Sequence, residues 1–215
     1  MPKLVDPEQR RREVAEAIFR IVRRDGLEHA SLRAVAAEAG LAIGSVRHYF
    51  DGQADLMIFA MRYFAERAGL RIREAAGRLK IPDPDAPAAE HVATLELLLA
   101  ETLPLDDRRR EEAVVWLAFV TAARTNPDLR PYARELHDDL AGMLDKLLAA
   151  ADRLGALRAG LDLAAERSRL HALLDGLTMH AVLQPDRITP SELATALRLH
   201  MIDIAAVPPE TPPLA

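Results

Sequence analysis

The sequence predicts an all-α protein, and three observations support this. Apolar residues recur at helical spacing along most of the 215 residues. No segment shows the period-two alternation, rich in β-branched residues, that is typical of strands. Glycine and proline residues divide the chain into helical segments of ordinary length. Because only 4% of the residues are aromatic, the helices must pack mainly through leucine, alanine, valine and isoleucine.

The first three helices are separated by residues that favour helix ends. Gly26 can end the first helix in a left-handed conformation, because glycine has no β-carbon. Ser31 is a natural N-cap for the second helix, and Gly40 can end that helix with a positive φ. Asp51 and Gly52 break the third helix. These three helices are therefore expected at residues 7–25, 31–39 and 43–50.

A longer fourth helix precedes a proline-rich segment. No proline occurs between Pro7 and Pro82, and three prolines then occur within residues 81–87. Such a segment cannot continue a helix and is typical of a linker or a long loop. We therefore expect the fourth helix to span residues 53–79.

Proline and glycine also separate the helices of the second half. Breaks are expected at Pro104, at Asn126-Pro127, at residues 155–160 and at residues 184–190. The five helices between these breaks are expected at residues 88–102, 108–125, 129–154, 163–183 and 191–204.

The charge is distributed unevenly along the chain. Residues 1–80 carry a net charge of +4, although the whole chain carries −5. A basic first part and an acidic remainder indicate that only the first part meets an anion. The overall negative charge argues against a protein that is covered by nucleic acid on all sides.

Residues 31–50 have the pattern of two helices joined by a tight glycine turn. Ala36 is expected where the helices cross, because only a small side chain fits there. Leu41, Val46 and Phe50 would hold the second helix against the first. A short exposed helix with small, hydroxyl and cationic groups fits the major groove of DNA, although an ordinary helical hairpin with charged outer faces gives a similar pattern. The outward residues are then Ile43, Gly44, Ser45, Arg47 and His48.

Residues 10–56 resemble the N-terminal domain of the TetR/AcrR family of bacterial transcriptional regulators. The resemblance rests on the order and spacing of about fifty residues rather than on any single one. The form of residues 47–50, with Gln53, is similar to the BetI-like subset of that family. The matching residues are Ala17–Phe19, Gly26, Ser31, Val35-Ala36, Ala39-Gly40, Gly44-Ser45-Val46, Tyr49-Phe50 and Asp55-Leu56.

The resemblance implies a helix-turn-helix DNA-binding domain over residues 1–52 and a helical effector-binding and dimerisation domain over residues 53–207. A disordered tail is expected at residues 208–215. The family implies homodimers that bind an inverted repeat in double-stranded DNA, usually repress, and respond to a small-molecule effector. The five outward residues above would face bases or nearby phosphates, and the backbone contacts would come from Ser31, Arg33 and Tyr49.

Two positions depart from many members of the family. Arg47 stands where many members have a tyrosine, and it could hold a phosphate or read a guanine. Gln53 stands where many have a lysine, so contact at the start of the fourth helix would rest on backbone N–H groups and the helix dipole. Residues 10–12 are three arginines, which form either an arm that meets DNA or a solvated helix face balanced by glutamates.

The second half offers polar groups among apolar ones. In a protein of this family, Trp116, Phe119, Val120, Thr178, Met179 and His180 would line an effector pocket, although each could equally be a core residue. Apolar stripes on the last two helices are candidates for a dimer face built as a four-helix bundle, although they could also pack within one subunit. The stripe residues are Leu170, Leu173, Leu174, Leu177, Ala181, Leu193, Leu197, Met201 and Ile204.

Other classes of function find little support. The sequence has no Walker loop and no GxGxxG, GxSxG or HExxH motif, and without cysteine it has no thiolate nucleophile. We therefore expect no enzyme, no cofactor and no metal site. The longest uncharged apolar stretch, residues 113–123, is too short to span a membrane, and no secretory signal opens the chain, so we expect a cytoplasmic protein. The alternatives are an activator, a ligand-independent regulator or, more remotely, an all-α enzyme or small-molecule carrier.

Overall fold

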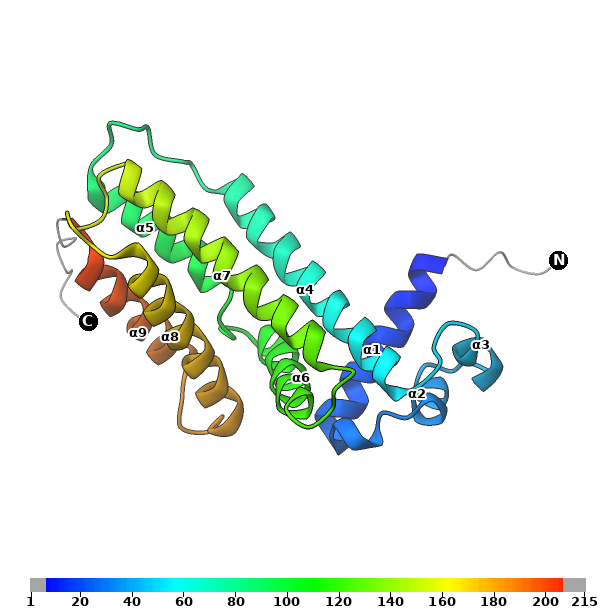
Figure 1. The fold of residues 1–215 in the computed structure, drawn as a ribbon. Helices are drawn as coiled ribbons and strands as arrows, with labels where there is room; N and C mark the ends of the chain where they lie inside the picture. The colour runs from blue at the N-terminus through cyan, green and yellow to red at the C-terminus, as the bar shows by residue number, and fades with distance from the viewer. Residues whose placement is uncertain (1–6, 207–215) are drawn as a thin grey trace. The chain divides into compact units, whose positions relative to one another are not determined.

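The computed structural model describes residues 7–206, and within that range it is all-α, which confirms the predicted fold class (Figure 1). One isolated bridge between Leu157 and Ala205 is the single β-type pairing in this range. The tail expected at residues 208–215 lies outside the described residues. The helices are α1 (Pro7–Asp25), α2 (Leu32–Glu38), α3 (Ile43–Arg47), α4 (Gln53–Arg78), α5 (Ala88–Ala100), α6 (Asp107–Ala123), α7 (Arg130–Arg153), α8 (Leu163–Leu183) and α9 (Pro190–Ile204), with a 3₁₀ turn η1 (Leu27–His29) after α1.

The helix ends follow the local signals in the sequence. The Ser31 hydroxyl accepts a hydrogen bond from the Ala34 N–H at 3.2 Å, which caps α2. Gly40 has a φ of +68°, as the turn between α2 and α3 requires. Thr189 and Glu192 form a reciprocal capping box at the start of α9. α3 ends at Arg47 and not at Phe50, so it is shorter than predicted.

The chain forms two compact units. The first comprises the chain up to Arg67 together with Glu111–Glu135, and the second comprises Ala68–Arg110 and the chain from Leu136 onward. This division does not coincide with the predicted boundary between residues 52 and 53. Long-range contacts explain the difference, because α6 joins the first unit through ion pairs to α1 and α4 that no local sequence signal shows.

The core of the first unit joins α1, α2, α3, α4 and α6. Its side chains are apolar and almost inaccessible to solvent, so the short helices of this unit are held by packing against longer ones. The largest fully buried side chains of this core are Ile18, Ile21, Leu56, Met61 and Phe119.

The core of the second unit contains the residues that the sequence assigned to a dimer face. Leu177 packs against this core, and the other residues of the stripes are within it or packed on it. The fully buried stripe residues cannot also contact a second subunit, so they act within one protomer, whereas Leu173 and Leu177 are half-buried. The stripe residues with an exposed fraction of 2% or less are Leu170, Leu174, Ala181, Leu193, Leu197, Met201 and Ile204.

Candidate DNA-binding surface

The two helices of the hairpin cross at small and branched apolar residues. Val35, Ala36 and Val46 are each 2% exposed or less. The Leu41 N–H donates a hydrogen bond to the Ala36 carbonyl at 2.8 Å, which fixes the turn directly against α2. The predicted role of Ala36 at the crossing is therefore consistent with its burial, and α3 packs directly against α2.

The surface of the hairpin carries the residues that the sequence singled out for DNA contact. Ile43 is half-buried at the first position of α3, where it partly faces the core. His48 caps α3, and its ring lies edge-on to the Tyr49 ring at a centroid distance of 5.1 Å. The other predicted residues are exposed, namely Ser31, Arg33, Gly44, Ser45, Arg47, His48 and Tyr49.

The segment after α3 is anchored by aromatic packing. The Phe50 ring lies 5.2 Å from the Phe59 ring of α4, measured between centroids. This contact holds the end of the hairpin against α4, whereas the sequence predicted that Phe50 would hold the second helix against the first. Tyr49, one residue earlier, is 59% exposed and leaves its hydroxyl available to a partner.

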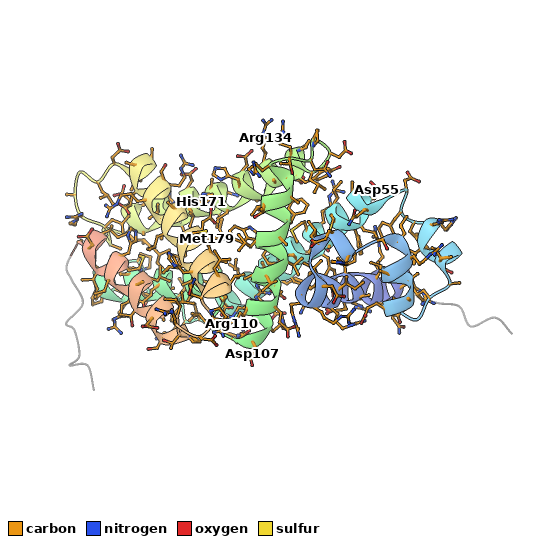
Figure 2. All side chains as sticks on the ribbon, turned by 90° about the horizontal axis from the view of Figure 1, so that it is seen from below. Asp55, Asp107, Arg110, Arg134, His171 and Met179 are labelled. Atoms are coloured by element: carbon orange, nitrogen blue, oxygen red, sulfur yellow. The ribbon has the colours of Figure 1, made fainter. Side chains whose placement is uncertain are left out.

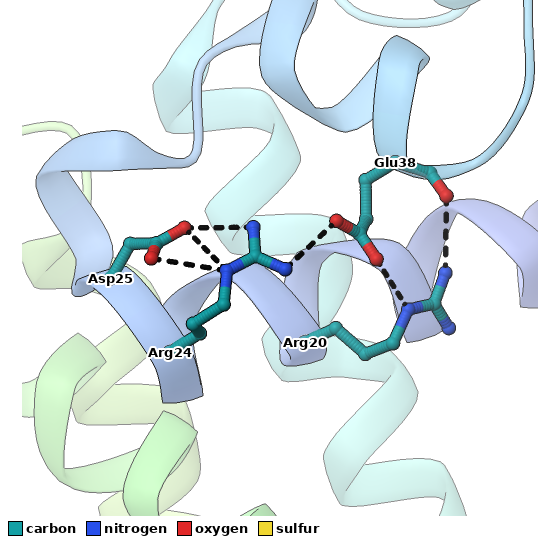
Figure 3. Close-up of polar contacts among 4 residues, drawn as sticks. All are labelled: Arg20, Arg24, Asp25 and Glu38. Carbon is teal, nitrogen blue, oxygen red and sulfur yellow. Dashed lines mark hydrogen bonds and ion pairs between the residues drawn. The ribbon is translucent and has the colours of Figure 1, made fainter.

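A cluster of charged residues joins α1 to the end of α2 (Figure 3). The Glu38 carboxylate accepts hydrogen bonds from Arg20 Nε at 2.7 Å and from Arg24 Nη1 at 3.2 Å. Arg24 also pairs with Asp25, at 2.8 Å. Hydrogen bonds from Arg20 and Arg24 lower the pKa of Glu38 below its usual value. This cluster was not predicted, because Arg20 and Glu38 are 18 positions apart and give no local signal in the sequence.

Gln53 has a structural role that the sequence did not indicate. Its side-chain amide donates a hydrogen bond to the Leu27 carbonyl at 2.9 Å. The first residue of α4 is thereby tied to η1, the turn that follows α1. The side chain that replaces the usual lysine of the family therefore positions the hairpin from within the protein.

The three arginines near the start of α1 are engaged within the first unit to different extents. Arg10 pairs with Glu13 at 3.0 Å, as a solvated helix face predicts. The Arg11 guanidinium lies 5.7 Å from the centre of the Phe59 ring. Arg12 is exposed. Arg10 and Arg11 therefore contact neighbouring side chains, as residues on a helix face do, whereas Arg12 is exposed to solvent.

The residues predicted to line an effector pocket belong to two different units. Trp116 and Val120 on α6 are half-buried, and Phe119 is fully buried. On α8, Thr178 is half-buried and the two residues after it are exposed. Phe119 is therefore a core residue in this structure, which was the alternative to a position in the pocket wall.

The second unit contains a histidine pair that the sequence analysis did not bring together. His171 of α8, labelled in Figure 2, is 6% exposed and stacks on the His137 ring of α7 at a centroid distance of 4.4 Å. Burial lowers the pKa of His171, while the nearby Asp175 carboxylate opposes that change. The two histidines are 34 positions apart, so helix packing alone brings them into contact.

Residues 7–206 contain neither a candidate metal cluster nor a helix that could span a membrane. In that part of the chain, no group of three or more histidine and acidic side chains is placed to hold a metal ion. None of the helices there is both long and apolar enough to cross a membrane.

Comparisons with known proteins agree with the geometry of the hairpin. Residues 91–205 match the family model for the C-terminal domain of BetI-type transcriptional repressors. The HTH-type transcriptional regulator PksA of Bacillus subtilis is 35% identical over 204 residues, covering 95% of this chain and 94% of that protein. The HTH-type transcriptional regulator BetI of Brucella anthropi is 28% identical over 190 residues, covering 86% and 88%.

A solved structure shows the same architecture. The transcriptional regulator of Rhodococcus sp. Rha1 is 29% identical and superposes with a TM-score of 0.77, over 93% of this chain and 99% of that one. The helix-turn-helix, the family model and the relatives lead to one conclusion. The chain belongs to the TetR family of helix-turn-helix transcriptional regulators, and its C-terminal domain is of the BetI type.

Proposed function

We propose that this protein is a repressor that binds an inverted-repeat operator as a homodimer and is released by a small-molecule effector. One observation carries the proposal: α3 exposes Gly44, Ser45 and Arg47 while Val46, between them, is buried in the scaffold. A helix held in this way can enter the major groove without losing its orientation. The protein would act by binding rather than catalysis, in the cytoplasm.

In this proposal α3 contacts the bases, and residues at the start of α2 and after α3 contact the phosphates. Small groups at Gly44 and Ser45 let the backbone of α3 approach the base edges, and Arg47 reaches beyond them. Ser31 and Arg33, at the start of α2, and Tyr49, after α3, would contact phosphates on either side. In a dimer the two α3 helices must lie about 34 Å apart, one turn of DNA.

Arg47→Ala distinguishes the two interpretations of this arginine. If Arg47 reads a guanine, affinity should fall by about 1–3 kcal/mol and specificity should relax at one base pair. If it holds a phosphate, affinity should fall evenly across sequences, and the slope of log K against log salt should decrease by about 1. Fluorescence anisotropy with operator variants at several salt concentrations measures both. Arg134→Ala, an exposed arginine on α7, is the control. Unchanged affinity and slope in Arg47→Ala would contradict the docking of α3.

We place the dimer contact on the outward faces of α8 and α9, not on the buried stripes. α8 exposes Met179 (40%) and Leu183 (58%), which lie four residues apart and so share one face; Figure 2 labels Met179. α9, which packs beside α8, exposes Leu199 (62%). Apolar side chains with this exposure on neighbouring helices favour association with a second copy across a two-fold axis.

Leu183→Asp combined with Leu199→Asp should convert the dimer to a monomer. Two carboxylates on each subunit would have to be desolvated at the interface, while the core of the second unit is untouched. Analytical ultracentrifugation gives the mass, and Ile81→Asp, at a 72% exposed site between α4 and α5, is the matched control. A dimer of unchanged stability in the double variant would show that another surface mediates association.

The effector would bind in the second part of the chain. Of the residues predicted to line its pocket, Thr178 and His180 of α8 lie within the second unit, and we propose them as effector contacts. A ligand can release DNA only if it binds the DNA-incompetent conformation more tightly. A thermal-shift screen identifies such a ligand, because it raises the melting temperature.

A gel shift with the DNA upstream of the protein's own gene tests the proposal as a whole. We expect a dimer-sized complex on an inverted repeat, and its loss when an effector found by thermal shift is added. Absence of specific binding by the ligand-free protein would overturn the proposal. Binding that strengthens with the effector would favour the activator alternative.

A further inference from the structure

An open groove with a volume of about 680 Å³ lies within the first unit, and no residue of α3 lines it. Three segments form it: the turn around η1, the first turns of α4, and the second half of α6 with the loop that follows. A groove of this size matches the sites that hold small organic molecules. None of the six residues predicted from the sequence to line an effector pocket lines it. The lining residues are Gly26, Leu27, Glu28, Gln53, Ala54, Met57, Val114, Leu117, Ala118, Thr121, Ala122, Arg124, Thr125, Asn126 and Leu129.

The wall of the groove is mainly apolar. Met57 on α4 and Val114, Leu117 and Ala118 on α6 are aliphatic, and Leu129 follows in the loop. Such a wall favours the apolar body of a ligand, since its contact with water is lost when the groove is filled.

Hydrogen-bond donors gather at the end of the groove formed by the C-terminus of α6. Arg124 is exposed, and among residues 9–206 its guanidinium has no ion-pair partner. Its backbone carbonyl accepts a hydrogen bond from Arg130 Nη2 at 3.4 Å. The Asn126 side-chain oxygen accepts from the Asp128 N–H, so its amide nitrogen is left to donate. The Thr121 hydroxyl lies one turn earlier.

Acceptors at the same end of the groove are already occupied. The Ala122 carbonyl accepts the N–H groups of Thr125 and Asn126, at 3.1 and 3.0 Å, and the Thr121 carbonyl accepts the Arg124 N–H at 3.2 Å. A cationic side chain with free donors beside it favours an anionic group, and a guanidinium matches the two oxygens of a carboxylate.

We propose that this groove binds a small amphipathic carboxylate, with its apolar body against α6 and its carboxylate on Arg124. The site differs from the effector site proposed above, and binding itself does not depend on DNA recognition. Its effect on DNA binding does rest on the proposed function. Leu27 and Gln53, which line the groove, form the hydrogen bond that ties η1 to α4, so a bound molecule contacts the joint that positions the hairpin.

Three probes that differ only in charge test the class of ligand. They are 2-naphthoate, the neutral 2-naphthylmethanol and the cationic 2-naphthylmethylammonium, each titrated into the full-length protein by isothermal calorimetry. We expect naphthoate to bind about fivefold more tightly than the alcohol, and the ammonium compound to bind more weakly still. Equal affinity for the three probes would overturn the proposal.

Two variants locate the binding. Ala118→Trp fills the groove and should abolish binding of all three probes, whereas Ala93→Trp, at an exposed site on α5, should not. Arg124→Gln should remove the preference for naphthoate, whereas Arg134→Gln should keep it. If Ala118→Trp does not fold, the NMR signal of the Gln53 side-chain amide decides: it should shift when naphthoate binds to the wild-type protein. An unshifted signal, or naphthoate affinity unchanged in Arg124→Gln, would refute the site.

Calorimetry and DNA binding, both measured on the same full-length protein, distinguish this proposal from the proposed function. Failure of the ligand-free protein to bind DNA would contradict repression but would leave the calorimetric result intact. Specific DNA binding without any naphthoate binding would contradict the groove site alone.

Discussion

Ala36→Leu should lower the affinity for operator DNA by about tenfold or more, since each base contact that is lost costs about 1–3 kcal/mol. Ala36 is 2% exposed, and its carbonyl accepts the Leu41 N–H at 2.8 Å. A larger side chain must push α3 away from α2, because the crossing has no room for it. The free energy of unfolding should also fall, by about 1–3 kcal/mol, as is usual for overpacked cores.

The neighbouring residue provides the matched control. Ala37 lies on the same helix but is exposed, so Ala37→Leu adds the same atoms without moving α3. Gel shifts measure the affinity, and urea unfolding followed by circular dichroism measures the stability. Equal effects of the two substitutions would show that α2 and α3 do not depend on close packing at Ala36.

Arg67→Met should destabilise the protein by about 3 kcal/mol, the lower end of the range for removing one partner of a buried ion pair. Arg67 Nη1 lies 2.6 Å from the Glu16 carboxylate of α1, and Arg67 Nε lies 3.2 Å from the Glu112 carboxylate of α6. Glu112 is only 2% exposed. The substitution takes a guanidinium from a buried carboxylate and separates three helices that it holds together.

Arg62→Met on the same helix is the control for this substitution. Arg62 is exposed and lies 5.0 Å from the centre of the Tyr132 ring, a contact worth about 0.5–1 kcal/mol. Adding Glu112→Gln to Arg67→Met should recover part of the loss, because the buried charge is removed. Urea unfolding gives all four free energies. A loss in Arg67→Met no larger than that in Arg62→Met would mean that the ion pairs are not important for stability.

The positions of the helices could be predicted because their signals are local. Ser31 caps α2 from within its own turn, and Gly40 adopts the positive φ for which glycine is suited. The exposure of Arg47 and the burial of Val46 follow from helical periodicity within one short segment. Most of the candidate DNA-binding surface was therefore predicted from about twenty consecutive residues.

The dimer stripes show where periodicity stops being informative. α8 carries apolar residues on more than one side: Leu170 and Leu174 are buried, whereas Met179 and Leu183 are exposed. Both sets have helical spacing, so the pattern alone cannot tell which set meets the protein's own core. The choice depends on the neighbouring helices α5, α7 and α9, which supply the other side of that core.

The sequence by itself determined the all-α class, the helix-turn-helix and the family, because these depend on spacing within short segments. Only the tertiary structure decided which apolar faces are buried, that Glu38 joins α2 to α1, and that Gln53 joins α4 to η1. The physical reason is distance along the chain: these contacts join residues 18 or more positions apart. Such residues meet only when whole helices pack, and no local pattern records that packing.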